Sequence, residues 1–199
     1  SHYLPWSYDG VLPTELPALV SWISDALQSE EKSTALGASL VWLSCRLGRS
    51  LHFVRLFAVS DDLHDEWTLS PGFQYLQRRS PQRQNAWQPD ESTQSLIQSY
   101  TREIRLRLPE GVTQALLKAT SNLAGDVLQL AHLWQHISDE SLEDWFNKIC
   151  RQYYPRITSL KLAHIAGLNA FQKTGDNNLS RMVASHPNSG LPGACGYAT

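Results

Sequence analysis

The segment Thr34–Ser44 constrains the fold of this chain more than any other stretch, because every residue in it is apolar, small or hydroxyl-bearing. It contains no proline and no charged residue, and its length is that of an ordinary helix. A surface helix is apolar along one stripe only, whereas a helix that is apolar on all sides must be enclosed by other elements. The sequence therefore predicts a buried helix that ends near Cys45.

The composition is that of a folded domain. Of the 199 residues, 42% are hydrophobic and seven are tryptophan, which supplies ample material for a core and argues against disorder. No apolar run reaches the ~18 residues of a membrane span, and the N-terminus lacks the basic start and apolar region of a signal peptide. We therefore expect one domain overall, without a membrane partner, and we interpret the abrupt start SHYLPWSYDG as that of a fragment of a longer chain.

The cysteines and histidines give no sign of a cofactor or a metal. Cys45, Cys150 and Cys195 are odd in number and have no metal-like spacing, which is typical of free thiols in a reducing compartment. His132 and His136 are spaced to chelate an ion from one helix face, but no third ligand suggests itself. We expect no bound metal and no cofactor.

Charge is unevenly distributed along the chain. The net charge is −2, which is unlike a typical DNA-binding domain. Between residues 78 and 107, however, six arginines (78, 79, 83, 102, 105 and 107) outnumber Asp90, Glu91 and Glu103. This stretch is either a local basic surface or a solvated polar face, and the sequence does not distinguish the two.

Periodicity predicts a mainly α protein with a small antiparallel β-sheet, an α+β fold. A hairpin is expected around Ser70-Pro71-Gly72, and the alternating EIRLRL of residues 103–108 predicts a third strand. N-caps are expected at Thr14 or Ser21, at Ser33 or Thr34, and at Thr158 or Ser159. Besides the buried helix, helices are expected up to Gln28, over Ser92–Tyr100, Val112–Ala119, Leu123–Ile137 and Leu142–Tyr154, and up to Gln172.

Four motifs in this order resemble the catalytic domain of the tyrosine recombinases, the phage integrase family. Gly48-Arg49-Ser50-Leu51-His52 is similar to the family's T-G-x-R-x-x-E-L box, with Arg46 as an alternative arginine one turn earlier. The segment RITSLKLAHIAG is similar to I-T-P-H-x-L-R-H, and GDNNLSRMVASHPNSG to G-x-x-x-x-x-x-x-L-G-H-S-S. Tyr197 follows where the family has its nucleophile, so the resemblance covers roughly residues 34–197.

The resemblance implies a site built from Arg49, His164, His186 and Tyr197. Tyr197 would attack a DNA phosphate and form a phosphotyrosyl link, Arg49 would hold the phosphate oxygens, and the histidines would move protons. Taken without the family, His164 is more often a packed core residue, and His186 is equally well explained as a helix terminator. Tyr197 would then be a buried aromatic or a residue of the chain's tail.

Two parts of the family's site are missing. On the helix that carries His164, Leu160 and Ala163 stand where the family has His and Arg, and Lys161 points to roughly the opposite side. The predicted hairpin also lacks the lysine that would protonate the leaving oxygen. We expect strand cleavage to be lost or strongly reduced.

These expectations together describe a double-stranded-DNA-binding, recombinase-like domain of a mobile genetic element. Residues 1–30 would form a lead-in and first helix, and residues 31–199 the recombinase-like domain. Its partners would be DNA and other copies of itself or other mobile-element proteins, in a bacterial cytoplasm, associated with the nucleoid. The alternatives are an active recombinase that uses Tyr197 and a helical interaction module that never touches DNA. The residues expected to contact DNA are Arg46, Arg78, Arg79, Arg83 and Lys161.

Overall fold

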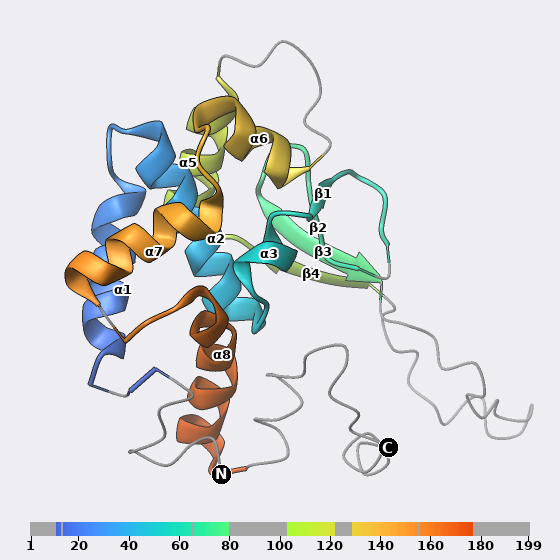
Figure 1. Ribbon diagram of the computed structural model, residues 1–199. Coiled ribbons are helices and arrows are strands. Elements are labelled where there is room, and N and C mark those ends of the chain that lie inside the picture. Colours follow the sequence, from blue (N-terminus) through green and yellow to red (C-terminus); the bar gives the residue numbers. More distant parts are fainter. Residues whose placement is uncertain are drawn as a thin grey trace, which may run out of the picture.

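The computed structural model describes residues 11–12, 14–64, 66–79, 103–121, 129–154 and 156–176 (Figure 1). Its helices are α1 (Leu16–Leu27), α2 (Lys32–Leu47), α3 (Leu51–Val54), α5 (Glu110–Thr120), α6 (Leu130–Ile137), α7 (Leu142–Tyr153) and α8 (Ser159–Thr174). Its strands are β1 (Ala58–Val59), β2 (Thr68–Leu69), β3 (Tyr75–Arg79) and β4 (Glu103–Arg107).

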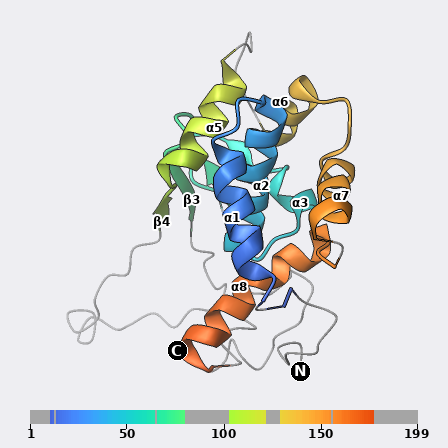
Figure 2. The ribbon, with the colours of Figure 1, turned by 90° about the vertical axis from the view of Figure 1, so that its left-hand side faces the viewer.

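Helix α2 is the centre of the fold, as the apolar segment predicts. Its side chains are buried on all sides, and α1, α5 and α8 pack along its length while α3 and α6 contact it (Figures 1 and 2). The helix ends at Gly48, whose left-handed conformation (φ 63°) suits a residue without a Cβ. The core is therefore a helical layer built around one enclosed helix.

The N-caps differ from those expected for the first two helices. Glu31 precedes α2, and its carboxylate accepts hydrogen bonds from the Ser33 and Thr34 hydroxyls at 2.7 and 2.8 Å. Glu15 precedes α1, and its carboxylate accepts a bond from the Leu12 amide at 2.9 Å. The expectation of hydroxyl caps was wrong in both places: a glutamate occupies the N-cap position, and its side chain does not bond to the helix N–H groups. At α8 the N-cap position is Thr158, as predicted.

The four strands form one small sheet in the order β1-β2-β3-β4. The β2–β3 hairpin and strand β4 lie where the alternating pattern predicts them, and both pairings are antiparallel. Strand β1, however, runs parallel to β2, so the sheet is mixed and the expectation of a purely antiparallel sheet was wrong. The residues around β1, LFAV at 56–59, are all apolar and do not alternate, which is why β1 left no strand signal in the sequence.

The other expected helices agree in part with the structure. Helices α5 and α7 cover the segments expected for them, and α8 extends two residues beyond Gln172 to Thr174. The helix expected over Leu123–Ile137 is present as α6 from Leu130 onward. The expected helix Ser92–Tyr100 lies outside the described residues.

An aromatic cluster joins α1, α6 and α7 over one side of α2. The ring centroid of Trp145 lies 6.3 Å from that of Trp22 and 5.3 Å from that of Trp134. The Trp134 indole N–H donates to the Glu140 carbonyl at 2.7 Å, which fixes the ring. Beneath the cluster, Gly37 of α2 allows the Trp145 ring to approach the helix backbone closely. In the described part of the chain, no helix is both long enough and apolar enough to pass through a membrane.

Candidate functional site

Arg49 lies at the turn between α2 and α3. The left-handed residue Gly48 bends the chain there, and the Arg49 amide donates to the Ser44 carbonyl at 3.3 Å. The Ser44 hydroxyl donates in turn to the Arg49 carbonyl at 2.5 Å, so both backbone groups of Arg49 are held by the last turn of α2. The sequence around Gly48 thus places this arginine at a fixed position, facing the sheet.

Arg49 lines a cavity of about 420 Å³ between α3 and the first strands. The cavity walls are mainly aromatic and aliphatic, and His64 and Glu66 are its other ionisable groups. The guanidinium of Arg78 stacks 5.1 Å over the ring of Trp67, one of the wall residues. The other lining residues are Phe53, Leu56, Phe57, Ala58 and Thr68.

His164 lies on α8, which packs against α2, α3 and α7. The side chain is half-buried and makes an interaction, so it is not a free group. The elements that carry Arg49 and His164 therefore touch, although His164 does not line the cavity that Arg49 lines. His186 and Tyr197 lie outside the described residues, so the nucleophile expected from the resemblance has no described position.

The two positions of α8 that depart from the family pattern, 160 and 163, differ in how far their side chains are exposed. Leu160 is 68% exposed in the first turn of α8, whereas Ala163 is only 1% exposed. A guanidinium at position 163 would have to replace a methyl group packed in the core. Position 163 therefore lacks both the arginine of the family pattern and the space for its side chain.

The residues expected to contact DNA do not form one surface. Arg46 lines a second cavity, formed by α1, α2 and α8, whereas Arg78 and Arg79 lie in β3 (Figure 1). Lys161 is half-buried on α8. Arg83 lies outside the described residues.

The β3–β4 ladder groups Arg79, one of the residues expected to contact DNA, with two arginines that were not expected to do so, Arg105 and Arg107. Tyr75 pairs with Arg107, Gln77 with Arg105, and Arg79 with Glu103. Residues directly opposite each other share a face, as do alternate residues of one strand. The side chains on this face that carry positive charge and are exposed are Arg79, Arg105 and Arg107, which we call the arginine strip.

The three arginines of the strip and the neighbouring Glu103 together carry a net charge of about +2. Glu103 lies 3.9 Å from the Arg105 guanidinium in an exposed pair. The alternating sequence EIRLRL predicts that Arg105 and Arg107 share one face of a strand. This pattern was the signal from which the two arginines could have been chosen as candidate DNA contacts.

A groove of about 510 Å³ continues from Arg107 to the start of α5. The first turn of a helix carries unpaired N–H groups and a partial positive charge, which favour anions. Glu110 lies in this first turn and offsets part of that charge. The remaining lining residues are Gln74, Leu108, Pro109, Thr113 and Gln114.

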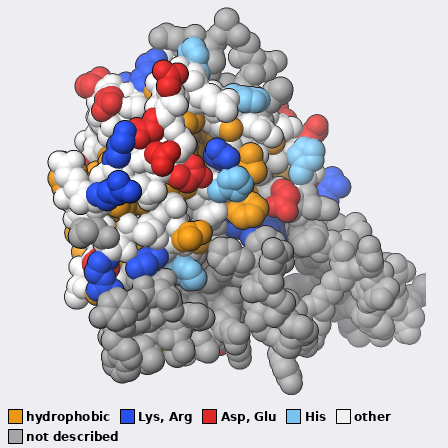
Figure 3. All heavy atoms as spheres, in the orientation of Figure 1, with side chains coloured by type: hydrophobic (Ala, Val, Ile, Leu, Met, Phe, Trp, Pro, Cys, Tyr) orange, Lys and Arg blue, Asp and Glu red, His pale blue; other side chains and the backbone are white. Residues whose placement is uncertain are grey.

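The helical side of the molecule has a different charge pattern. Basic and acidic side chains are interspersed there (Figure 3). Interspersed charges give no strong field of one sign. The arginine strip therefore differs from the helical side by concentrating like charge.

The described residues contain no group of three or more potential metal ligands. His132 and His136 are both exposed on α6. Burial raises the pKa of the Cys45 and Cys150 thiols to about 12, so both are protonated at neutral pH. These thiols are core groups and not nucleophiles.

A scan against protein-family models matched no family, and searches of curated proteins and of solved structures found no similar protein. The resemblance to tyrosine recombinases therefore rests on the sequence motifs quoted above alone.

Proposed function

We propose that this chain is a double-stranded-DNA-binding domain of the tyrosine-recombinase type, part of a mobile genetic element, with strand cleavage lost or strongly reduced. The observation that carries the proposal is the arginine strip on one face of the β3–β4 ladder. Arg79 and Arg107 are 28 positions apart in the sequence, and strand pairing places the three arginines on one face of the ladder, around the buried Gln77.

The geometry of the strip suits a phosphate backbone. Arg105 and Arg107 lie two residues apart on β4, about 7 Å along the strand, and Arg79 extends the strip on β3. Exposed guanidinium groups bind phosphate through paired N–H donors and release counterions from DNA on contact. This binding depends on local charge, so the net charge of −2 for the whole chain does not oppose it.

The start of α5 supports the same surface. It lies in the groove beside Arg107, and a helix N-terminus attracts phosphate. Glu103 and Glu110 reduce the attraction, which favours moderate, salt-sensitive affinity over tight binding.

The proposed loss of cleavage rests on α8. The positions where the family has His and Arg are taken by Leu160 and Ala163, which cannot stabilise a developing negative charge. Loss of one such donor typically lowers a rate by ~10²–10³, and loss of a general acid by ~10²–10⁴ more. The domain would then serve to bind DNA and to assemble copies of itself or other mobile-element proteins on it.

The experiment is a fluorescence-anisotropy titration of a 30-base-pair duplex between 50 and 200 mM salt. For the wild type we expect affinity that falls steeply as salt rises. Replacing the three arginines of the strip with glutamine should reduce the slope of log K against log[salt] by about 2.7, at ~0.9 for each phosphate contact.

A matched control removes three positive charges elsewhere: Lys118, Lys148 and Arg151 are replaced by glutamine on α5 and α7. Lys118 pairs with Glu30 and Lys148 with Glu140 at partly exposed positions, and such pairs typically contribute ~0.2–1 kcal/mol to stability. The proposal predicts a nearly unchanged slope for this control. It fails if the wild type does not bind at 50 mM salt, or if the control weakens binding as much as the strip variant does.

A further inference from the structure

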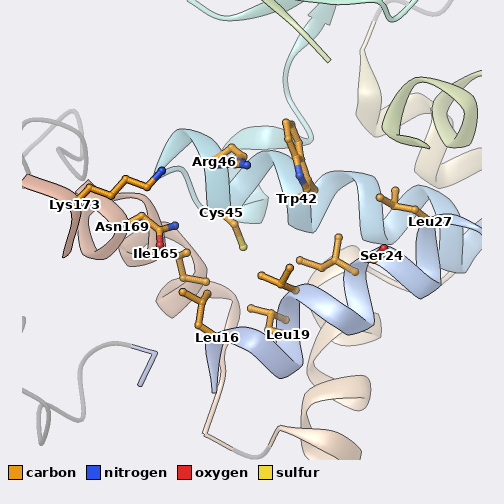
Figure 4. Close-up of a pocket in the computed structure, with 12 residues that line it drawn as sticks. Leu16, Leu19, Ser24, Leu27, Trp42, Cys45, Arg46, Ile165, Asn169 and Lys173 are labelled. Atoms are coloured by element: carbon orange, nitrogen blue, oxygen red, sulfur yellow. The ribbon is translucent and has the colours of Figure 1, made fainter. Parts of the chain in front are cut away.

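A second cavity of about 420 Å³ lies between α1, α2 and α8 and takes no part in the proposed DNA surface (Figure 4). It is on the α1 side of α2, whereas the sheet lies on the opposite side (Figures 1 and 2). Its volume is within the range of ~300–1,000 Å³ that small-molecule sites occupy.

The body of the cavity is apolar. Leu19, Ile23 and Ile165 are almost fully buried and form its floor, and Val20 is 56% exposed at the rim. The lining residues of α1 extend from Leu16 to Leu27, a length of roughly 16 Å at 1.5 Å per residue. This shape accommodates an extended aliphatic chain that lies along α1.

One end of the cavity is cationic. Asn169 and Lys173 of α8 lie at that end, away from the Ser24 and Leu27 end, and Arg46 of α2 lies between them and Trp42 (Figure 4). The Arg46 guanidinium lies 5.5 Å over the ring of Trp42, which holds it at the cavity wall.

No acidic group among the lining residues balances this charge. Within their described bounds, α2 and α8 contain no Asp or Glu, and Asp25 of α1 is not part of the lining. Neither Arg46 nor Lys173 forms an ion pair with another described residue. Within the part of the chain that the structure describes, no acidic side chain therefore neutralises the cationic end.

The lining is poor in ionisable groups, which are Arg46, Lys173 and Cys45. It contains no His, Asp or Glu, and its one thiol, Cys45, is kept protonated because burial raises its pKa to about 12.

We propose that this cavity binds a linear amphipathic carboxylate of the medium-chain fatty-acid class. The aliphatic chain lies along Leu19 and Ile23, and the carboxylate lies between Arg46 and Lys173, where the Asn169 amide donates a further hydrogen bond. The charge asymmetry of the cavity selects an anion over an uncharged chain, and its volume selects a small molecule over a protein surface.

The test compares three probes with the same ten-carbon chain, below their micelle concentrations, by isothermal titration calorimetry and by the shift in melting temperature. Decanoate is expected to bind, decanol to bind at least tenfold more weakly, and decylammonium not to bind. Arg46→Gln and Lys173→Gln should each weaken decanoate at least tenfold and leave decanol unchanged. Lys161→Gln, on the same helix but outside the cavity, is the matched control and should change neither probe.

A further variant tests the apolar half. Val20→Trp adds a large side chain at the exposed rim, where folding is not at risk, and should abolish decanoate binding. Equal affinity for decanoate and decanol, or binding unaffected by the Arg46, Lys173 and Val20 variants, would overturn the proposal. So would a dimer, detected by light scattering, that Val20→Trp dissociates, because the cavity would then be an interface between copies. DNA binding is measured separately, so failure here leaves the arginine strip untouched.

Discussion

Gly37→Ala is the substitution for which the structure gives the sharpest prediction. Gly37 lies in the middle of α2, and the Trp145 ring lies directly over it. A Cβ added at this position would meet three carbon atoms of that ring at 2.2, 2.4 and 2.7 Å. Real Cβ atoms do not approach other atoms so closely, so the ring or the helix must move.

The ring has little freedom to move. Trp145 is packed between Trp22 and Trp134, and the Trp134 ring is itself fixed by its bond to the Glu140 carbonyl. Overpacking a core typically costs 1–3 kcal/mol, and a rigid indole places this site in the upper part of that range. Alanine offsets about 1 kcal/mol of this cost, because it is the better helix former.

The expected result is a net loss of about 1–2 kcal/mol in the free energy of unfolding. For a chain of this length that corresponds to a melting temperature about 2–8 °C lower. Urea denaturation followed by circular dichroism gives the free energy, and calorimetry gives the melting temperature.

Gly111→Ala is the matched control. Gly111 is also helical, but the nearest atom to an added Cβ is the Leu27 Cδ1 at 3.9 Å, an ordinary contact. This variant should be neutral or more stable by up to about 1 kcal/mol. If Gly37→Ala is as stable as the wild type, or if both variants shift alike, the close packing of α7 on α2 is refuted.

Two further predictions concern the thiols and the nucleophile. In a Cys195→Ser background, the native protein should react slowly with a disulfide reagent at pH 8, because burial raises the pKa of Cys45 and Cys150 to about 12. Thiols that react as fast as those of the unfolded chain would contradict the burial. Because the unfolded chain releases these thiol protons at lower pH than the folded chain does, the free energy of unfolding should fall as pH rises from about 9 to 12. The fall is at most ~2.7 kcal/mol per pH unit for the two thiols together. With a nicked suicide DNA substrate, we expect no covalent adduct, because the second arginine is absent; an adduct that Tyr197→Phe abolishes would show an active recombinase.

Local patterns were sufficient for the elements that have a clear period. The apolar segment after Thr34 became α2, and the alternation around Ser70-Pro71-Gly72 and in residues 103–108 became strands β2, β3 and β4. The αL residue Gly48 ends α2 just before Arg49, which lies in the Gly-Arg box of the resemblance. These features depend on contacts between residues close in sequence, which periodicity records directly.

Shorter or competing signals were missed. Strand β1 has two residues and pairs with β2 in parallel, a contact that no repeating pattern announces. Glu31 and Glu15 occupy the N-cap positions for which Ser or Thr was expected. Several possible N-cap residues lie within a few positions of each helix start, and the backbone geometry decides which of them precedes the helix. From the sequence, Arg105 and Arg107 were recognised only as part of a basic stretch. Their position on the same face as Arg79 depends on the β3–β4 register.

The amino-acid sequence by itself determined that one helix is enclosed, that a hairpin follows, and that positions 160 and 163 carry no ionisable group. Only the tertiary structure decided which charges lie together. It separated Arg46 from Arg78, paired Arg79 with Glu103 on a strand that begins 24 residues later, and brought Lys173 to the same cavity as Leu19. The physical reason is that helix and strand periods arise from residues close together in the sequence. Surfaces and cavities arise from packing between distant segments, and the order of segments along the chain does not say which of them pack together.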